Sequence, residues 1–321
     1  MVVPEPGRGQ GSGHLRLLAR VARMYHEQGM RQPEIATALG ISQPRVSRLL
    51  KEAAARGVVR TVVALPEGVH TEIEEGLQRR YSLRDAVVVD AGTGDDVVPA
   101  LASAAAFYFG ATLRCGDVIG VPARSGTLLA AVDRMHPRGT QAADRVVQVV
   151  GGPDGPEARF HATRLIGRLA AVTRARPVPV PSAGVAGTAA ARDALLRDAA
   201  VAEVAAQWRE LTVVLVGIGA LEPPPLPPSR DDADREELRS LGAVGDVCLR
   251  FFDAGGDVVG SAFDRRVVGM DADALRSVGR RVAVAGGERK HAAIRAALRG
   301  GWVNVLITDL EAARHLLTGP R

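Results

Sequence analysis

Residues 30–57, MRQPEIATALGISQPRVSRLLKEAAARG, carry the pattern that most restricts how this chain can fold. Ile35 and Leu39 recur at helical spacing, and Pro33 suits the first turn of a helix. Gly40 can end that helix, because glycine adopts a left-handed backbone conformation without a Cβ clash. The pattern predicts two short helices joined by a tight turn.

The second of these helices is predicted to present cations to solvent. Ser42 suits its N-cap, and Val46 and Leu49 would face inward. The donors left on the outer face suit phosphates and base edges, so the segment indicates a helix-turn-helix that enters the major groove of DNA. The residues expected to contact double-stranded DNA are Gln32, Ser42, Gln43, Arg45, Ser47, Arg48 and Lys51.

Positive charge is concentrated around this segment. Between His14 and Arg60 there are nine Arg or Lys and three Asp or Glu, a net charge of +6, whereas the whole chain carries +5. The remainder therefore sums to −1, as expected when a polyanion binds to one small module. The alternative interpretation is a solvated basic helical hairpin, which the turn chemistry disfavours.

Composition points to a second, larger domain. The chain has 321 residues, of which 46% are hydrophobic and only 3% aromatic. A core built from Val, Leu, Ile and Ala suits helices packed on a parallel sheet. No apolar run reaches the roughly 18 residues of a membrane span and no signal peptide is recognisable, so we expect a cytoplasmic protein without a membrane partner. Cys115 and Cys248 lack metal-type spacing and are expected to be reduced thiols in a core.

These patterns predict a domain order. We expect a disordered leader over 1–13, a helix-turn-helix domain over 14–65 that ends in a β-branched strand over 58–65, a linker with a connector helix over 66–81, and an effector-binding and oligomerisation domain over 82–321.

Region 82–321 alternates short β-rich runs with helical patterns, which predicts a mostly parallel α/β sheet with both faces covered. The expected strands are 86–89, 118–121, 146–150, 178–180, 213–216, 282–284 and 303–307. The expected helices are 97–113, 127–135, 160–171, 189–208, 288–298 and 310–317. The fold class is therefore α/β, with an all-helical N-terminal domain.

Small ligands of open α/β sheets bind outside the carboxyl ends of the strands, where three glycine-containing turns are expected. After strand 118–121, backbone amides at a helix start and the hydroxyls of Ser125 and Thr127 would form an anion cradle. Lys290 follows a third strand and could reach the same anion, although it could also be a solvated lysine of a first helical turn. The residues expected to bind an effector at these turns are Ser125, Gly126, Thr127, Gly217, Gly219, Gly287 and Lys290.

Ordered sequence blocks resemble one family along nearly the entire chain. They are GISQPRVSRLLKEAAARGVV (40–59), GDVIGV (116–121), VVQVVGG (146–152), LVGIGAL (215–221), LGAVGDVCLRFFDAGG (241–256), DRRVVGM (264–270), VAVAGGERKHAAIRAAL (282–298) and VNVLITDLEAARHLL (303–317). The chain resembles the SorC/DeoR-like sugar-binding transcriptional regulators, of which the central glycolytic gene regulator is the best-known type.

The resemblance implies a large domain similar to phosphosugar isomerases of the glucosamine-6-phosphate deaminase and ribose-5-phosphate isomerase type. It implies phosphate contacts from Ser125, Gly126 and Thr127, and sugar or phosphate contacts from Asp246, Arg266 and Lys290. It also implies a sugar or sugar-phosphate effector and tetrameric assembly. The sequence departs from the family pattern where Pro-Ala-Arg-Ser-Gly-Thr (122–127) lacks the usual Trp, and where Arg31 replaces a small hydroxyl cap. The Pro-rich stretch 221–232 is expected to be a flexible surface loop near the pocket.

The expected function is a DNA-binding transcriptional repressor of a carbohydrate operon, a homodimer or homotetramer without cofactor, metal or catalytic residue. The alternative is an active phosphosugar isomerase or deaminase with an appended DNA-binding module. Its general base would be Asp246, Asp264 or Glu288, but no spacing marks a catalytic pair. A third possibility, a protein–protein interaction module, fits the concentrated positive charge less well.

Overall fold

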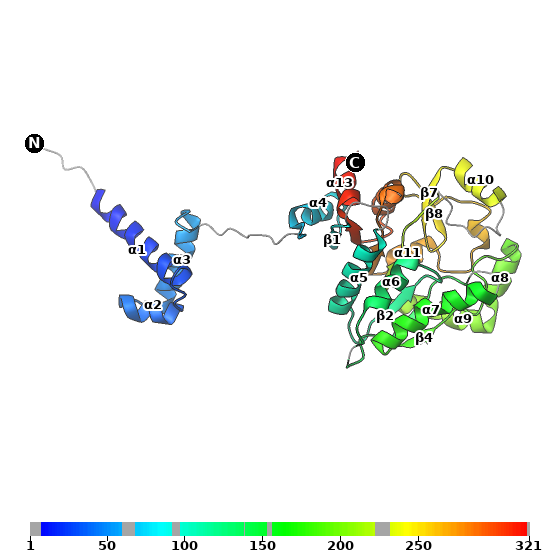
Figure 1. Cartoon of the computed structure of the whole chain (residues 1–321), viewed down its shortest axis with the longest axis horizontal. Helices are drawn as coiled ribbons and strands as arrows, with labels where there is room; N and C mark the ends of the chain where they lie inside the picture. Colours follow the sequence, from blue (N-terminus) through cyan, green and yellow to red (C-terminus); the bar gives the residue numbers. More distant parts are fainter. Residues whose placement is uncertain are drawn as a thin grey trace, which may run out of the picture. The chain divides into compact units, whose positions relative to one another are not determined.

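The computed structural model describes residues 8–59, 68–91, 97–137, 139–152, 156–221 and 232–319. The chain divides into two compact units, Met1–Leu65 and Pro66–Arg321 (Figure 1). In the described parts of both units, no helix is long and apolar enough to cross a membrane.

The smaller unit is a helical domain with the predicted helix-turn-helix. Its helices are α1 (Arg8–His26), α2 (Gln32–Leu39) and α3 (Gln43–Ala55). They pack through buried apolar side chains, including Leu18 of α1, Ile35 of α2 and Val46 of α3. Gly40 separates α2 from α3 with φ of 62°, and the next amide, Ile41 N–H, donates to Ala36 O at 3.0 Å. The turn chemistry expected at Gly40 is confirmed.

Two predictions at the edges of this unit need correction. Helix α1 begins at Arg8, so residues 8–13 are helical rather than part of a disordered leader. Their glycines cost about 1 kcal/mol each in a helix interior, which disfavours a helix without excluding one, and composition therefore placed its start too late. Val58 and Val59 lie in a bend, where both amides donate to Ala53 O at 2.9 and 3.2 Å, and not in a strand. The rest of the predicted strand 58–65 lies outside the described residues.

The larger unit is built on a seven-stranded sheet in the order β1-β10-β9-β5-β2-β3-β4, in which every neighbouring pair is parallel. The predicted parallel α/β sheet is confirmed, with β4 and β10 each displaced by two residues from the expected runs. The strands are β1 (Asp85–Val89), β2 (Val118–Val121), β3 (Arg145–Gln148), β4 (Arg176–Val178), β5 (Val213–Val216), β9 (Arg280–Val284) and β10 (Val305–Asp309).

Helices cover both faces of this sheet, because its strands carry apolar side chains on both sides. One core lies between the sheet and the three helices α5 (Val98–Thr112), α6 (Gly126–Arg134) and α7 (Pro156–Thr173). A second core lies on the other face of the sheet. The helices that contribute to it are α4 (Thr71–Tyr81), α9 (Ala199–Gln207), α10 (Asp232–Ser240), α11 (Ala272–Ser277), α12 (His291–Arg299) and α13 (Leu310–Thr318), with α8 (Ala189–Arg197) packed at its edge.

The helix predicted over 189–208 is divided into α8, α9 and a 3₁₀ turn, Trp208–Glu210. Asp198 ends α8 and begins α9, because its Oδ1 accepts a hydrogen bond from the Ala200 amide at 3.0 Å. An aspartate that can cap a helix offers the backbone an alternative to continuing one.

A small antiparallel sheet that the sequence did not predict lies beside the main one. It contains β6 (Gly219–Ala220), β7 (Ala243–Val247) and β8 (Arg250–Asp253) in that order, and α10 (Asp232–Ser240) precedes β7. Cys248 and Leu249 form the two-residue turn between β7 and β8, with φ of 54° and 65°. Of the two cysteines, Cys248 is buried as expected, whereas Cys115 is exposed. The Pro-rich stretch lies outside the described residues from 222 to 231.

Candidate functional site

Helix α3 exposes the cations predicted to contact DNA. Val46 and Leu49 are buried against α1 and α2, which turns Arg45, Arg48 and Lys51 outward. None of these three makes an ion pair with another side chain in residues 8–59 that the structure describes. Gln43 and Ser42 are also exposed, whereas Ser47 and Gln32 are partly buried.

The acidic side chain of α3 is neutralised within the domain. Glu52 accepts a hydrogen bond from His14 at 2.9 Å and pairs with Arg56 at 2.7 Å. The hydrogen bond with His14 is the main reason that the pKa of Glu52 lies below its usual value. Glu52 therefore does not neutralise Arg48 or Lys51, and the exposed face of α3 stays cationic.

The turn after β2 meets the end of β5. Ser125 is the N-cap of α6, and its Oγ accepts a hydrogen bond from the Leu128 amide at 3.3 Å. A Cβ atom on Gly217 would lie 3.2 Å from that Oγ. Gly126 is the exposed first residue of α6, and Thr127 is partly exposed beside it. The helix start predicted to hold an anion is present, with the Ser125 hydroxyl already used as its cap.

The end of β5 also meets β7. Gly219 pairs with Asp246, and a Cβ atom on Gly219 would lie 1.9 Å from Asp246 Oδ1, so a larger residue there would displace the Asp246 carboxylate. Asp246 Oδ2 accepts a hydrogen bond from the Leu249 amide at 3.0 Å. Burial raises the pKa of Asp246, and the nearby Lys290 charge opposes that shift. Burial lowers the pKa of Lys290, opposed by Asp246. The structure thus brings Gly219, Asp246 and Lys290 together.

Asp309 holds the turn that leads to Lys290, and the sequence reasoning missed it. Gly287 has φ of 88°, and its amide donates to Asp309 Oδ2 at 2.7 Å. Asp309 Oδ1 accepts from the Ala312 amide at 2.9 Å, which makes Asp309 the N-cap of α13, and the side chain is only 2% exposed. An aspartate between an apolar strand and a helix is an N-cap signal, so the pattern could have been found.

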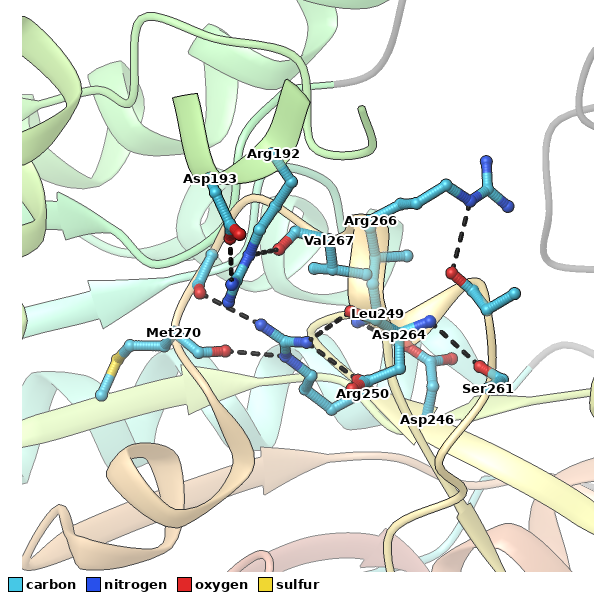
Figure 2. A network of polar contacts seen from close by, with 12 residues as sticks. Arg192, Asp193, Asp246, Leu249, Arg250, Ser261, Asp264, Arg266, Val267 and Met270 are labelled. Carbon is cyan, nitrogen blue, oxygen red and sulfur yellow. Dashed lines mark hydrogen bonds and ion pairs between the residues drawn. The ribbon is translucent and has the colours of Figure 1, made fainter. Parts of the chain in front are cut away.

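Arg266 lies elsewhere in the network. It belongs to a short 3₁₀ turn, Asp264–Arg266, and forms an ion pair with Asp234 of α10. Its Nε–H also donates to Ala262 O at 3.4 Å. In the described part of the chain no hydrogen bond or ion pair joins Arg266 to Asp246 or Lys290, and Figure 2 shows its side chain directed away from Arg250. Its contact with an effector stays a prediction.

Arg250 is the centre of a buried network that supports the segment carrying Arg266 (Figure 2). Its side chain is 3% exposed and forms an ion pair with Asp264 at 2.8 Å. Its Nε–H donates to Met270 O at 2.8 Å, and one Nη group donates to Gly269 O at 3.1 Å. Because Arg250 follows the Cys248–Leu249 turn, whose Leu249 amide donates to Asp246, the network joins that turn to residues 264–270.

A cavity of about 460 Å³ lies away from these turns. It is bounded by α8, α9 and residues 269–278, and its lining includes Arg192 and Trp208. Ser125, Asp246 and Lys290 do not line it. Within the described residues, no group of three or more His, Cys, Asp or Glu side chains could hold a metal ion.

A basic helix-turn-helix joined to a parallel α/β unit with anion-compatible turns defines a class: ligand-responsive DNA-binding regulators. Comparisons with known proteins identify the family. Residues 68–318 match the family model of the sugar-binding domain, and residues 15–61 match that of the homeodomain-like domain. The chain belongs to the SorC/DeoR-like family of sugar-binding transcriptional regulators.

Full-length relatives support this assignment. The sorbitol operon regulator of Klebsiella pneumoniae is 28% identical over 96% of this chain and 99% of its own. The deoxyribonucleoside regulator of Bacillus subtilis is 31% identical over 94% of this chain and 97% of its own. The crystal structure of the full-length Klebsiella regulator covers 95% of this chain and 100% of its own, with a TM-score of 0.70 and 27% identity. The chain is a transcriptional regulator, and the enzyme alternative is not supported.

Proposed function

We propose that the protein represses a carbohydrate-metabolism operon and acts in the cytoplasm, where its operator DNA lies. A sugar or sugar phosphate bound in the larger unit would control its affinity for that DNA. The observation that carries the DNA-binding part is the cationic face of α3, where Arg45, Arg48 and Lys51 are exposed and form no ion pair with any residue that the structure describes. Arg45, Arg48 and Lys51 would contact phosphates or guanine edges, with Gln43 and Ser47 reading bases. Gln32 and Ser42 would lie at the helix starts that approach the backbone.

The effector would bind at the carboxyl ends of β2, β5 and β9. Support comes from the meeting of three turns there, with Gly217 against Ser125 and Gly219 against Asp246 beside Lys290. The amides of Gly126 and Thr127 at the start of α6 would hold a phosphate, and Lys290 would supply charge. Asp246 would accept hydrogen bonds from sugar hydroxyls. The relatives' printed names, which include a sorbitol operon and deoxyribonucleosides, support a carbohydrate-derived effector.

The protein would act as a homodimer or homotetramer. Paired recognition helices would then read half-sites about 34–36 Å apart, or a multiple of that spacing. Support for assembly comes from α5, which contains no charged residue and leaves Phe107 80% exposed. Val98 at its start is also exposed. An uncharged helical face of this kind is typical of a surface that another subunit covers.

DNA binding is tested with a duplex that the wild-type protein selects from a random library. Arg48→Ala should weaken binding by about 1–3 kcal/mol if Arg48 contacts a guanine edge. The matched control is Arg23→Ala, because Arg23 is exposed on α1 and paired with Glu27 at 2.9 Å. Equal affinities of the Arg48 variant and the wild type at fixed salt would remove Arg48 from the interface.

Effector binding is tested by a thermal-shift screen against sugars, polyols and their phosphates, since a ligand of the folded state raises the melting temperature. Lys290→Ala should abolish the shift and leave DNA binding intact, whereas Arg289→Ala, at the exposed neighbouring residue, should preserve both. A full response from the Lys290 variant would place the effector elsewhere. Transcription from the selected duplex, with and without protein, distinguishes repression from activation.

A further inference from the structure

Helix α4 is the first helix of the larger unit, and the chain between α3 and α4 joins the two units. Helix α4 packs beside α13 (Figure 1). Leu77 and Leu316 are fully buried, and a Cβ atom on Gly76 would lie 3.3 Å from the Leu317 side chain. The helix nearest in sequence to the DNA-binding unit is therefore in close contact with α13.

Side chains of α4 cap the carboxyl end of α13. The last carbonyl groups of a helix have no partner within it and carry partial negative charge. Tyr81 Oη donates to Leu316 O at 2.9 Å, and Arg80 donates to Leu317 O at 2.7 Å and also to Gly319 O. A cation and a hydroxyl from α4 thus satisfy two of these carbonyls and that of the C-cap residue Gly319, so α4 is tied to the carboxyl end of α13.

The amino end of α13 lies at the candidate effector site. Asp309 caps this helix with one carboxylate oxygen and accepts the Gly287 amide with the other. The Lys290 amide in turn donates to Gly287 O at 3.0 Å. The Gly287 amide donates to Asp309, and it is also a donor that an anion at this turn would use. An anion that binds there competes with Asp309 and repels its carboxylate.

A second connection ties the same turn to α13. His291, directly after Lys290, stacks on His315 with ring centroids 4.5 Å apart, and Arg295 donates to His315 O at 3.0 Å. Helix α13 is thus held at its amino end by the effector turn, along its side by α12 and at its carboxyl end by α4.

We propose that α13 couples the effector site to α4 and thereby to DNA binding, with Asp309 as the positioning residue at one end and Arg80 and Tyr81 at the other. The two states differ in the partner of the Gly287 amide, which is Asp309 in one and the effector in the other. This inference rests on the function proposed above, and it names the part of the protein that carries the response. Coupling requires such an element with two arrangements that both sites bias.

Asp309→Asn tests the first end without changing the size of the side chain. Asparagine keeps one acceptor oxygen, so it can cap α13 or accept from Gly287 but cannot do both. Hydrogen exchange of the full-length protein should become about fivefold faster in residues 287–290 and also in α4, the factor expected for loss of a typical helix cap. The matched control is Asp271→Asn, because Asp271 caps α11 through the Ala274 amide at 2.7 Å, and asparagine can replace it there. Exchange in β2 and β3 provides the reference for global stability.

Tyr81→Phe and Arg80→Met test the other end and should accelerate exchange of the Gly287 amide. The control is Arg79→Met, because Arg79 lies on the same helix but is exposed and pairs only with Glu75 among the described residues. Faster exchange confined to the mutated end, for both Asp309→Asn and Tyr81→Phe, would overturn the proposal.

A second measurement compares DNA affinity with and without an equimolar mixture of ribose 5-phosphate, glucose 6-phosphate and fructose 6-phosphate as the probe. We expect Arg80→Met to retain the probe-induced thermal shift and lose most of the change in DNA affinity. A variant that keeps the full change refutes the coupling. If the wild-type protein binds DNA but the probe changes neither its melting temperature nor its DNA affinity, the proposed effector class is wrong. The hydrogen-exchange measurements still test the coupling in that case.

Discussion

Replacing Arg250 by Met should destabilise the larger unit strongly, although Arg250 lies in neither proposed contact surface. Met keeps most of the side-chain volume and removes the guanidinium. The change leaves Asp264 without its cation and the carbonyls of Met270 and Gly269 without their donors. These groups lie in an interior where unpaired polar atoms are costly.

Breaking a buried ion pair by removing one partner typically costs about 3–5 kcal/mol. Asp264 is 26% exposed, so water partly compensates its charge, and we expect a loss near the lower end, about 3 kcal/mol. Domains are usually stable by about 5–15 kcal/mol, so the variant should fold but unfold at a clearly lower denaturant concentration.

Urea unfolding followed by tryptophan fluorescence measures this loss in the larger unit alone, because both tryptophans, Trp208 and Trp302, belong to it. The control is Arg79→Met, whose pair with Glu75 has side chains that are 71% and 57% exposed and should contribute at most about 1 kcal/mol. A loss for Arg250→Met no larger than that of the control, at unchanged m-value, would refute the reasoning.

Three further outcomes are expected. Gly219→Ala should abolish the thermal shift given by sugar phosphates, because the new Cβ would lie 1.9 Å from Asp246 Oδ1; a retained shift would contradict the site. Phe107→Glu places a charge on the otherwise uncharged exposed face of α5 and should lower the oligomeric mass measured by light scattering. An unchanged mass would place the subunit interface elsewhere. Burial lowers the pKa of Lys290 below 10.5, and only the protonated lysine attracts an anion. Affinity for an anionic effector should therefore fall as the pH rises through that pKa. Calorimetry from neutral to alkaline pH tests this, and an affinity that does not change with pH would exclude Lys290 as a contact.

The parallel sheet was predictable because its strands are apolar on both faces. Runs such as Val118–Val121 and Val213–Val216 are fully buried, and burial of this kind leaves a continuous apolar signal in the sequence. Strand β7, Ala243–Val247, alternates buried and partly exposed residues instead. Its turn to β8 consists of Cys248 and Leu249, where the usual signal of such a turn is Asn-Gly. The small sheet was therefore missed.

The candidate site was predictable only where its parts are local. The start of α6 follows from a Ser-Gly-Thr segment after a strand, and Ser125 indeed caps that helix. The ion-pair partners of Arg250 and Arg266 lie 14 and 32 residues away in the sequence, and nothing in the local pattern identifies them. Ion pairs between distant segments depend on how the elements pack, so a sequence shows the charges but not their pairing.

The different surroundings of the two cysteines make the native protein suitable for labelling at a single site. Thiolate is the form that reacts with maleimides, and burial raises the pKa of the Cys248 thiol, which suppresses that form. Cys115 is exposed on the turn between α5 and β2, at the opposite end of β2 from Ser125. A fluorescent dye could therefore be attached to the wild-type chain at Cys115 alone, away from the proposed effector turns, without removing or adding any residue.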